Sequence, residues 1–516
     1  MSLAEALTAA GESSPDRTAL RFLVDGGTAD EWSSGRLRGA AAACAGRFGE
    51  LGLAAGDRVA FLLGSRPELV TSYLAVLGAG AVAVPMNTAY RPRELEHILT
   101  DAAPRLVVTE RSRRDVLDAT SAATGSEILC VEDLLPDGPS EGPSEGPSEG
   151  PPDGHGDPVA RAAVDADDPA LILYTSGTTG RSKGAVLTHR NVLATMRSLR
   201  RAWSWSADDV LLLALPLFHT HGLVVGLHCA LASGATTLVL PRFDADRVVD
   251  VLATGEPTLF FGVPTMYVRL LRALDEAEPT PDLGHMRLFC SGSAPLDPAV
   301  FDEFRRLTGH TILERYGMTE TGMLLSNPYD GPRLAGTVGR ELPGVQARVV
   351  DGEDRDVAEG EEGELLVRGE NVFSGYWRRD RESDACFTTD ARGERWFRTG
   401  DLARRDPGNG YYTLLGRRHD LIISGGFNVY PREVEEVLMG LPGVREAAVV
   451  GRPHPEWGEQ VVAFVVADPA LDDETLTAGC AERLAPFKVP RRFHRIDELP
   501  RNSLGKVQKH LLPAQP

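Results

Sequence analysis

The stretch that most constrains the fold is a glycine- and hydroxyl-rich string at residues 174–184, which reads Tyr-Thr-Ser-Gly-Thr-Thr-Gly-Arg-Ser-Lys-Gly. The apolar run at 170–173 before it predicts a buried strand. Thr188 after it predicts a helix start, because threonine caps helices and apolar Val192 and Met196 follow at helical spacing. The sequence thus predicts a buried strand, a tight loop and a capped helix in this order.

The chemistry of this loop suits a polyphosphate ligand. Glycines let the backbone approach a ligand with its N–H groups, and the hydroxyls and Lys183 supply further donors. The string differs from the common nucleotide loop, in which the last glycine and the lysine are adjacent, because Arg181 and Ser182 separate Gly180 from Lys183. A surface loop rich in turn-forming residues is the alternative interpretation.

The string resembles the phosphate loop of the acyl-adenylate-forming enzymes, which include acyl-CoA synthetases, luciferases and peptide-synthetase adenylation domains. The resemblance implies ATP, Mg²⁺ and coenzyme A as the small molecules involved. It also implies that the ATP phosphates contact Thr175, Ser176, Gly177, Thr178, Thr179, Gly180 and Lys183.

Length and composition exclude several classes of protein. The chain has 516 residues and 42% hydrophobic content, enough for two or more domains, and its net charge of −20 argues against a nucleic-acid partner. The six cysteines lie far apart, form no Cys-x-x-Cys, and predict reduced, mostly buried thiols. Neither an export signal nor an apolar run of membrane-spanning length is evident, so the expected location is the cytoplasm.

Strands alternate with helices over the first part of the chain. Residues 58–63 predict a strand, 73–77 a helix, and 81–85 and 106–108 two further strands. This order favours a doubly wound, mostly parallel sheet. Residues 138–154 repeat Gly-Pro-Ser-Glu and cannot bury a core, so they predict a disordered insert.

The second part of the chain changes character twice. Short strands and turns from 340 to 417 predict a small β-rich subdomain, and helix–strand–strand–helix signals after residue 421 predict a compact α+β module. We therefore place an N-terminal adenylation domain at 1–416, a hinge at 417–419 and a mobile C-terminal domain at 420–516. The family usually has Asp or Lys at the pivot, and here the position is His419.

Three further motifs, at residues 291–295, 315–320 and 397–401, resemble nucleotide-binding elements of the family. Residues 315–320, Arg-Tyr-Gly-Met-Thr-Glu, would supply Tyr316 for adenine stacking, and Thr319 for the α-phosphate. Glu320, with Thr175, would serve Mg²⁺, which prefers hard oxygen ligands shared with phosphates. The resemblance assigns to the nucleotide site the residues Glu314, Arg315, Tyr316, Gly317, Met318, Gly292, Ser293, Ala294, Asp401 and Arg417.

The last motif, at 500–506, resembles the family's Pro-Arg-x-x-x-Gly-Lys. A cation between the attacking carboxylate and the ATP α-phosphate lowers their repulsion, and Lys506 is the candidate. A solvated basic tail is the alternative interpretation. Ser424, Gly425 and Gly426 resemble the loop that forms the pantetheine tunnel after the small domain rotates.

The acyl pocket is predicted around Phe-His-Thr-His-Gly-Leu at 218–223. His219 joins Lys506 and Thr319 as a catalytic candidate, and His221, Ser291 and Met318 are candidates for substrate contact. Zinc binding is disfavoured because the two histidines lack clustered Cys or carboxylate partners. Arg269 and Arg287 could together hold a second carboxylate of the substrate, or each could be a surface residue paired with a nearby acid.

The strings around these residues closely resemble malonyl-CoA synthetases. The resemblance implies an ATP-dependent acid–CoA ligase acting on malonate, with methylmalonate as a further candidate. A medium-chain or aryl acyl-CoA synthetase is the alternative among enzymes, and a nucleotide-binding sensor without catalysis is the alternative of another class. A carrier-loading adenylation domain and a luciferase-type oxygenase are less favoured.

Overall fold

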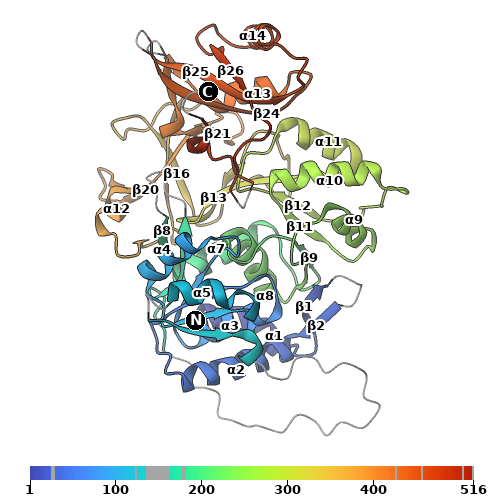
Figure 1. The fold of residues 1–516 in the computed structure, drawn as a ribbon, viewed down its shortest axis with the longest axis vertical. Helices are drawn as coiled ribbons and strands as arrows, with labels where there is room; N and C mark the ends of the chain where they lie inside the picture. The colour runs from blue at the N-terminus through green and yellow to red at the C-terminus, as the bar shows by residue number, and fades with distance from the viewer. Residues whose placement is uncertain are drawn as a thin grey trace.

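The computed structural model describes residues 1–24, 29–121, 125–134, 163–175, 182–424, 427–454, 457–502 and 505–513. The predicted insert at 138–154 and the loop residues 176–180 lie outside the described residues. A large body carries the N-terminal strands and helices, and a smaller body with the C-terminal elements sits on one end of it (Figure 1).

The first sheet of the large body has seven strands, in the order β18-β8-β7-β4-β3-β5-β6. Strands β4, β3, β5 and β6 run parallel with β7, whereas β8 and β18 add an antiparallel edge. The strands are β3 Arg58–Leu62, β4 Val82–Pro85, β5 Leu106–Thr109, β6 Glu127–Cys130, β7 Pro169–Thr175, β8 Lys183–Thr188 and β18 Gly375–Tyr376. The predicted strands at 58–63, 81–85, 106–108 and 170–173 are confirmed.

The second sheet has nine strands, in the order β15-β14-β13-β12-β11-β9-β10-β1-β2. The six from β13 to β1 are parallel, and the edges β2, β14 and β15 are antiparallel. The strands are β1 Thr18–Leu23, β2 Ala29–Ser33, β9 Val210–Leu213, β10 Thr236–Val239, β11 Leu259–Gly262, β12 Leu288–Ser291, β13 Leu313–Met318, β14 Gly322–Ser326 and β15 Arg340–Glu341.

Helices cover these sheets and share a core with them. The largest buried cluster joins residues of both sheets with those of α1, α2, α3, α7 and α8, and a second cluster lies under α9, α10 and α11. The helices of the large body are α1 Leu3–Glu12, α2 Ser34–Glu50, α3 Pro67–Gly78, α4 Pro92–Ala102, η1 Arg111–Arg113, α5 Arg114–Ser121, α6 Val131–Leu134, α7 His189–Ala202, the π-helix η2 His221–His228, α8 Cys229–Ser233, α9 Ala245–Ala253, α10 Pro264–Glu276 and α11 Pro298–Thr308.

The helix after the phosphate string begins as predicted. Thr188 is the N-cap of α7, where its backbone N–H donates to Asn191 Oδ1 and its hydroxyl accepts from the Asn191 backbone N–H. This reciprocal cap holds the start of α7 directly against the end of β8.

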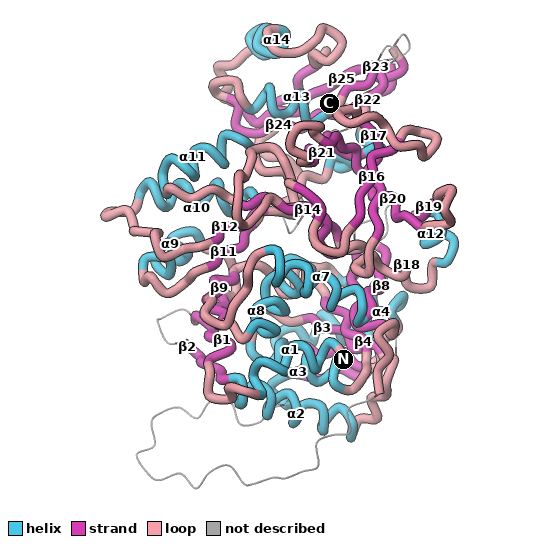
Figure 2. The backbone as a smooth tube through the Cα atoms, turned by 180° about the vertical axis from the view of Figure 1, so that it is seen from behind, coloured by secondary structure: helices cyan, strands magenta, loops and turns pink. Residues whose placement is uncertain are grey.

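The predicted β-rich subdomain forms a five-stranded antiparallel sheet beside the two larger sheets (Figure 2). Its elements are β16 Gln346–Val350, β17 Glu362–Arg368, α12 Asp380–Ala385, β19 Phe387–Thr389, β20 Arg395–Arg405 and β21 Tyr412–Arg417. The chain leaves this sheet at Arg417, and η3 Arg418–Asp420 leads on to the next sheet.

The C-terminal body is an α+β module with its own buried core. Its elements are β22 Ile422–Ser424, β23 Phe427–Val429, α13 Pro431–Met439, β24 Val444–His454, β25 Gly458–Ala467, α14 Asp473–Ala481, β26 Arg492–Arg495 and η4 Lys509–Leu511. The strands expected at 447–450 and 461–466 run longer because β24 and β25 pair along their whole length. The resulting fold class, mixed α/β with a large N-terminal and a smaller C-terminal domain, is the one predicted.

Candidate active site

The predicted site residues gather where the C-terminal ends of strands in both sheets meet the small body. Thr175 ends β7, Ser291 ends β12, and the 315–320 motif runs through the end of β13. Parallel strands present their C-terminal ends at one edge of a sheet, so residues far apart in sequence become neighbours there.

Asp401 and Tyr316 form the side of the site predicted for the ribose. The Asp401 carboxylate is buried, accepts the hydroxyl of Tyr316, and pairs with Arg417 Nε at 2.8 Å. The Asp401 backbone N–H donates to Thr399 Oγ1 at 3.0 Å. Strands β13, β20 and β21 therefore bring one carboxylate and one cation together.

Glu320 lies next to the phosphate string and can serve a metal ion. The Tyr376 hydroxyl donates to Glu320 Oε1 at 2.9 Å and Thr175 Oγ1 donates to the same oxygen at 3.4 Å. Among the described residues, no group donates a hydrogen bond to Glu320 Oε2. A buried carboxylate with one oxygen to spare, beside a threonine hydroxyl, fits Mg²⁺, which is usually bound by one or two carboxylates together with substrate phosphates.

Tyr376 is a residue that sequence reasoning missed. Besides holding Glu320, its ring lies 5.3 Å from the ammonium of Lys183, the cation of the phosphate string. Tyr376 sits in β18, which pairs with β8 next to Lys183. No sequence motif marks it, because its role follows from a strand pairing between residues almost two hundred positions apart.

Lys506 comes from the small body and reaches the large one. Its neighbours include the carboxylates of Glu320, Asp401 and Asp420 and the guanidinium of Arg417. Part of the Lys506 residue is accessible to solvent, but protein atoms surround its ammonium group. This is expected for a side chain that projects from one domain toward another. Burial first, and then the charge of Arg417, lower the pKa of Lys506 below its usual value.

The loop that carries Lys506 is held in place by hydrogen bonds between its own side chains and backbone. The Lys506 N–H donates to Asn502 Oδ1 at 2.9 Å, and Arg501 Nη1 donates to the Gly505 carbonyl at 2.6 Å. Gly505 has φ of +74°, and a β-carbon there would lie 2.9 Å from Thr265 Oγ1 at the start of α10. Only glycine gives this close approach between the two bodies without strain.

The two histidines of the predicted acyl pocket lie at the start of η2. Burial lowers the pKa of His219 to about 4, and burial also holds the pKa of His221 well below its usual value, so both rings are neutral near pH 7. His221 Nδ1 lies 3.3 Å from Ser293 Oγ, and its ring stacks on Phe261. A histidine held neutral here can accept or donate one hydrogen bond but supplies no charge.

Arg287 does not lie at the site, which corrects the prediction of a two-arginine clamp. Arg287 precedes β12, at the N-terminal edge of the sheet, and its Nε and Nη2 hold the two oxygens of buried Asp209 at 2.5 and 2.7 Å. Arg269 is exposed on α10, with its guanidinium 5.1 Å from the centre of the Phe243 ring. The physical reason is strand direction, because the residue before a parallel strand lies at the edge opposite to the residue after it.

Glu314 and Arg315 are neighbours in β13 that face different surroundings. Glu314 Oε1 accepts the Leu296 N–H at 3.1 Å, its Oε2 has no partner among the described residues, and burial raises its pKa to about 7. Arg315 is buried near the Cys290 thiol and His221, and its Nε and Nη2 have no partner in the part of the chain that the structure describes. Alternation along the strand separates the two side chains.

The other predicted residues are placed as follows. Ser291 and Gly292 are buried at the end of β12, and Ser293, Ala294, Gly317, Met318 and Thr319 are half-buried around the same space. Ser424 is buried at the end of β22. Ser176, Gly177, Thr178, Thr179, Gly180, Gly425, Gly426 and the side chain of His419 lie outside the described residues.

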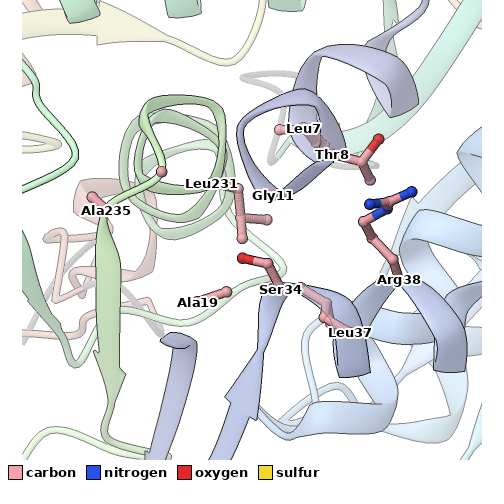
Figure 3. A pocket seen from close by; sticks show the side chains of 10 residues that line it. Leu7, Thr8, Gly11, Ala19, Ser34, Leu37, Arg38, Leu231 and Ala235 are labelled. Atoms are coloured by element: carbon pink, nitrogen blue, oxygen red, sulfur yellow. The ribbon is translucent and has the colours of Figure 1, made fainter. Parts of the chain in front are cut away.

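One pocket among the described residues is separate from this site. A pocket of about 20 Å³, room for roughly one water molecule, lies among α1, α2, β1 and α8 (Figure 3). Its lining includes Leu7, Leu37 and Leu231 but none of the predicted site residues.

In the part of the chain that the structure covers, no helix is long and apolar enough to cross a membrane. No cluster of three or more His, Cys, Asp and Glu residues there could hold a metal ion. All six cysteines are free, as predicted, and five of them are buried.

Comparison with protein families identifies two matching regions. Residues 7–377 match the model of the AMP-binding enzyme, and residues 433–506 match the AMP-binding enzyme C-terminal domain. Among curated proteins, the mitochondrial malonate–CoA ligase of Xenopus laevis is 36% identical over 492 residues, covering 88% of this chain and 82% of its own. A long-chain-fatty-acid–CoA ligase of Salmonella typhimurium is 34% identical over 490 residues, covering 90% and 86%.

Among solved structures, ATP-bound MatB from Rhodopseudomonas palustris superposes with a TM-score of 0.88 at 41% identity, covering 99% of this chain and 98% of its own. Apo MatB from the same organism, with the same identity and coverage, gives a TM-score of 0.78. The arrangement described here is therefore more similar to the ATP-bound form than to the apo form.

Proposed function

Because this chain belongs to the AMP-binding enzyme family, we propose that it is an ATP-dependent malonate–CoA ligase, which forms malonyl-CoA through a malonyl-adenylate. The observation that carries the proposal is the position of Lys506, which belongs to the small domain and lies close enough to Asp401 and Glu320 of the large one for their charges to act on it. The residues for activating a carboxylate with ATP are thus assembled in one place.

In the first step a malonate oxygen attacks the α-phosphorus of ATP, and the bond to pyrophosphate breaks. Lys506 offers positive charge where two anions approach each other, and charge placed in advance is the strongest device for lowering such a barrier. Asp401 holds the ribose hydroxyls, and Tyr316 gives the base a flat surface. Glu320 and Thr175 would hold Mg²⁺, which neutralises phosphate charge when bound.

In the second step the sulfur of coenzyme A attacks the acyl carbon of the adenylate, and AMP leaves with the electron pair of the broken bond. Lys506 has no task in this step. We propose that residues 417–419 act as the hinge by which the small domain, 420–516, turns away and brings Ser424, Gly425 and Gly426 to the site. The chain changes sheets at this point, between β21 and β22, which suits a hinge.

Malonate is favoured over a long acyl chain by the polarity of the acyl pocket. His221 and Ser293 face each other there, and His221 Nε2 is buried without a partner among the described residues. A tunnel for a hydrocarbon chain would leave such groups unsatisfied at a cost of roughly 1–3 kcal/mol each. The six free cysteines suit the reducing cytoplasm, which we propose as the location.

The test is pyrophosphate release by the wild-type enzyme with malonate, methylmalonate, acetate, octanoate and benzoate, with thioester formation followed in parallel. We expect malonate to give the highest kcat/KM and the monocarboxylates to be at least 100-fold poorer. Faster reaction with octanoate or benzoate would make the protein an acyl-CoA synthetase of the alternative class. ATP binding with no AMP formed from any acid would favour the sensor.

A further inference from the structure

We propose that His97 and Asp101 of α4 are positioning residues for ATP, which hold the two ends of the phosphate string that the structure describes. Both act through neighbours of Thr175 and Lys183, the string residues suited to Mg²⁺ and phosphate. The inference deepens the proposed function and rests on it in one respect, because it takes the phosphate string to bind ATP. Neither His97 nor Asp101 belongs to a sequence motif of the site.

The phosphate string connects two antiparallel strands of the seven-stranded sheet. Thr175 ends β7 and pairs with Lys183, which begins β8. The chain therefore leaves the sheet and returns to it at neighbouring points. The ends of strands open more readily than their middles, so the pairing of β7 with β8 holds these two residues less firmly than the residues deeper in the sheet. Contacts from a third element are needed to fix the Thr175 hydroxyl and the Lys183 ammonium relative to each other.

One contact of α4 holds the strand that leads into the string. The Tyr174 hydroxyl donates to Asp101 Oδ2 at 2.8 Å, and Arg379 Nη2 donates to the other oxygen, Oδ1, at 3.1 Å. A β-carbon on Gly184, the residue opposite Tyr174, would lie 3.2 Å from Tyr174 Cζ, so a glycine there leaves room for the tyrosine ring. Tyr174 therefore reaches α4 from the position directly before Thr175.

A second contact of α4 holds the strand that follows the string. His97 Nε2 lies 2.8 Å from the carbonyl oxygen of Ser182, the residue directly before Lys183. A carbonyl oxygen can only accept, so Nε2 carries a hydrogen and donates it, whether the ring is neutral or protonated. The His97 ring also meets the Tyr174 ring edge to face, with 6.3 Å between the ring centres. The two contacts of α4 therefore adjoin each other.

The helix that carries both residues is itself firmly packed. His97 and Asp101 are four positions apart in α4, so they lie on one face of the helix, one turn from each other. The helix lies beside β8 (Figure 1 and Figure 2). Its apolar residues are buried in the core of the seven-stranded sheet, and they are Leu95, Ile98, Leu99 and Ala102. A packed helix thus provides one fixed point for each strand end of the string.

The end of α4 also holds the segment that contacts Lys183 from the other side. Trp377 Nε1 donates to the Asp101 carbonyl oxygen at 3.1 Å. The residue before it, Tyr376, donates its hydroxyl to Glu320 and places its ring 5.3 Å from the Lys183 ammonium. Pyrophosphate leaves in the adenylation step, so thioester formation makes no use of groups that hold the outer phosphates. Loss of the α4 contacts should therefore weaken ATP binding and slow adenylation alone.

The test measures ATP affinity and the two half-reactions separately in His97→Ala. We expect the Kd for ATP, from calorimetry, to rise about five- to tenfold, the effect of losing one hydrogen bond. The KM for malonate, and the rate of thioester formation from supplied malonyl-adenylate, should both stay within about twofold of wild type, because neither needs the outer phosphates. His97→Gln should recover most of the ATP affinity, since its amide Nε2 can donate to the Ser182 carbonyl in place of the imidazole.

His310→Ala is the matched control, because His310 Nε2 donates to the Leu283 carbonyl at the same distance, 2.8 Å, away from the site. It removes the same kind of hydrogen bond and should leave the ATP Kd unchanged. Tyr174→Phe covers the case in which His97→Ala does not fold. It removes only the hydroxyl that Asp101 accepts, and we expect it to raise the ATP Kd by about threefold.

Four results would overturn the inference: an unchanged ATP Kd in His97→Ala or Tyr174→Phe, equal loss in both half-reactions, an equal rise in Kd in His310→Ala, or no recovery in His97→Gln. Wild-type enzyme that binds no ATP, or that forms no adenylate from any acid, would instead overturn the proposed function.

Discussion

The two edges of the nine-stranded sheet hold their buried charges in opposite ways. At the N-terminal edge, Asp209 accepts from both Nε and Nη2 of Arg287, from the Thr258 hydroxyl and from the Ser206 N–H. At the C-terminal edge, Arg315 and Glu314 keep atoms without partners among the described residues. A satisfied ion pair holds the sheet together, whereas unsatisfied buried groups mark where ligands bind.

The comparison also explains why an arginine that lies near a pocket motif in the sequence need not lie in the pocket. Arg287 directly precedes β12 and is half-buried, whereas Arg315 lies within β13 of the same sheet and is buried, so the two lie toward opposite edges. The edge at which an arginine lies determines whether one of the protein's own carboxylates is there to pair with it.

The largest effect should come from removing the cation that the small domain delivers. In Lys506→Ala we expect pyrophosphate release with malonate to slow by about 1,000-fold, because charge stabilisation of the adenylation step is lost. Thioester formation from supplied malonyl-adenylate should stay near the wild-type rate, and the melting temperature should not change. Single-turnover measurements of the two half-reactions check this.

Lys488→Ala is the matched control, since this lysine of the small domain pairs with Glu433 outside the site. It should leave both half-reactions unaltered. Equal loss of both half-reactions in Lys506→Ala would show that Lys506 acts in more than the first step.

The next effect sharpens the contrast at the N-terminal edge. Asp209→Asn leaves the guanidinium of Arg287 half-buried without its anion, and we expect the free energy of unfolding to fall by about 4 kcal/mol. The ratio of kcat/KM for malonate to that for propionate should not move. Denaturant unfolding and the two-substrate assay measure these quantities.

The control for that change is Asp302→Asn, which removes an exposed ion pair with Arg305 and should cost no more than about 1 kcal/mol. An Asp209→Asn enzyme of normal stability that had lost malonate selectivity would contradict this comparison, because it would show that the Arg287–Asp209 pair contacts the substrate.

The smallest effect depends on pH and comes from Glu314. Burial raises its pKa from 4.5 to about 7 in the folded enzyme, so the folded state binds a proton more tightly than the unfolded one. The stability gained from the protonated group is present below pH 4.5 and is lost as pH rises to about 7. Above that pH the ionised carboxylate costs at most about 3 kcal/mol.

Glu314→Gln should therefore melt at the wild-type temperature at pH 4.5 and at a higher temperature at pH 8, both measured without nucleotide. Exposed Glu96→Gln is the control and should show no such dependence. A difference from wild type that is the same at both pH values would mean that folding does not raise the pKa of Glu314.

Much of the fold could be predicted because its signals are local. The run at 170–173, the cap at Thr188 and the strands at 58–62 and 82–85 all have the periodicity and end signals of the elements they form. The antiparallel edge that β18 adds next to β8 carries no such signal, since two residues, Gly375 and Tyr376, form it. Tyr376 was therefore missed, although it contacts Glu320.

The residues of the candidate site also divide into those that local motifs identify and those that only the fold places. Contiguous motifs identified Glu320, Asp401 and Lys506, and the structure brings these three together. The residues for the substrate's second carboxylate were assigned from proximity to motifs, and that assignment failed for Arg287. A motif fixes which residues are adjacent in the chain, but not which edge or face of a sheet each side chain occupies.

Local chemistry therefore specified a strand, a loop and a helix suited to phosphate and an α/β architecture, while the resemblance of residues 500–506 to a family motif indicated Lys506 as a candidate. Short-range periodicity and spacing carry that information, because they act through neighbouring residues. The tertiary structure alone decided that Arg287 pairs with Asp209 and that Nε and Nη2 of Arg315 have no partner among the described residues. Strand order, strand direction and the alternation of side chains across a sheet settle such pairings, and these depend on residues distant in the sequence.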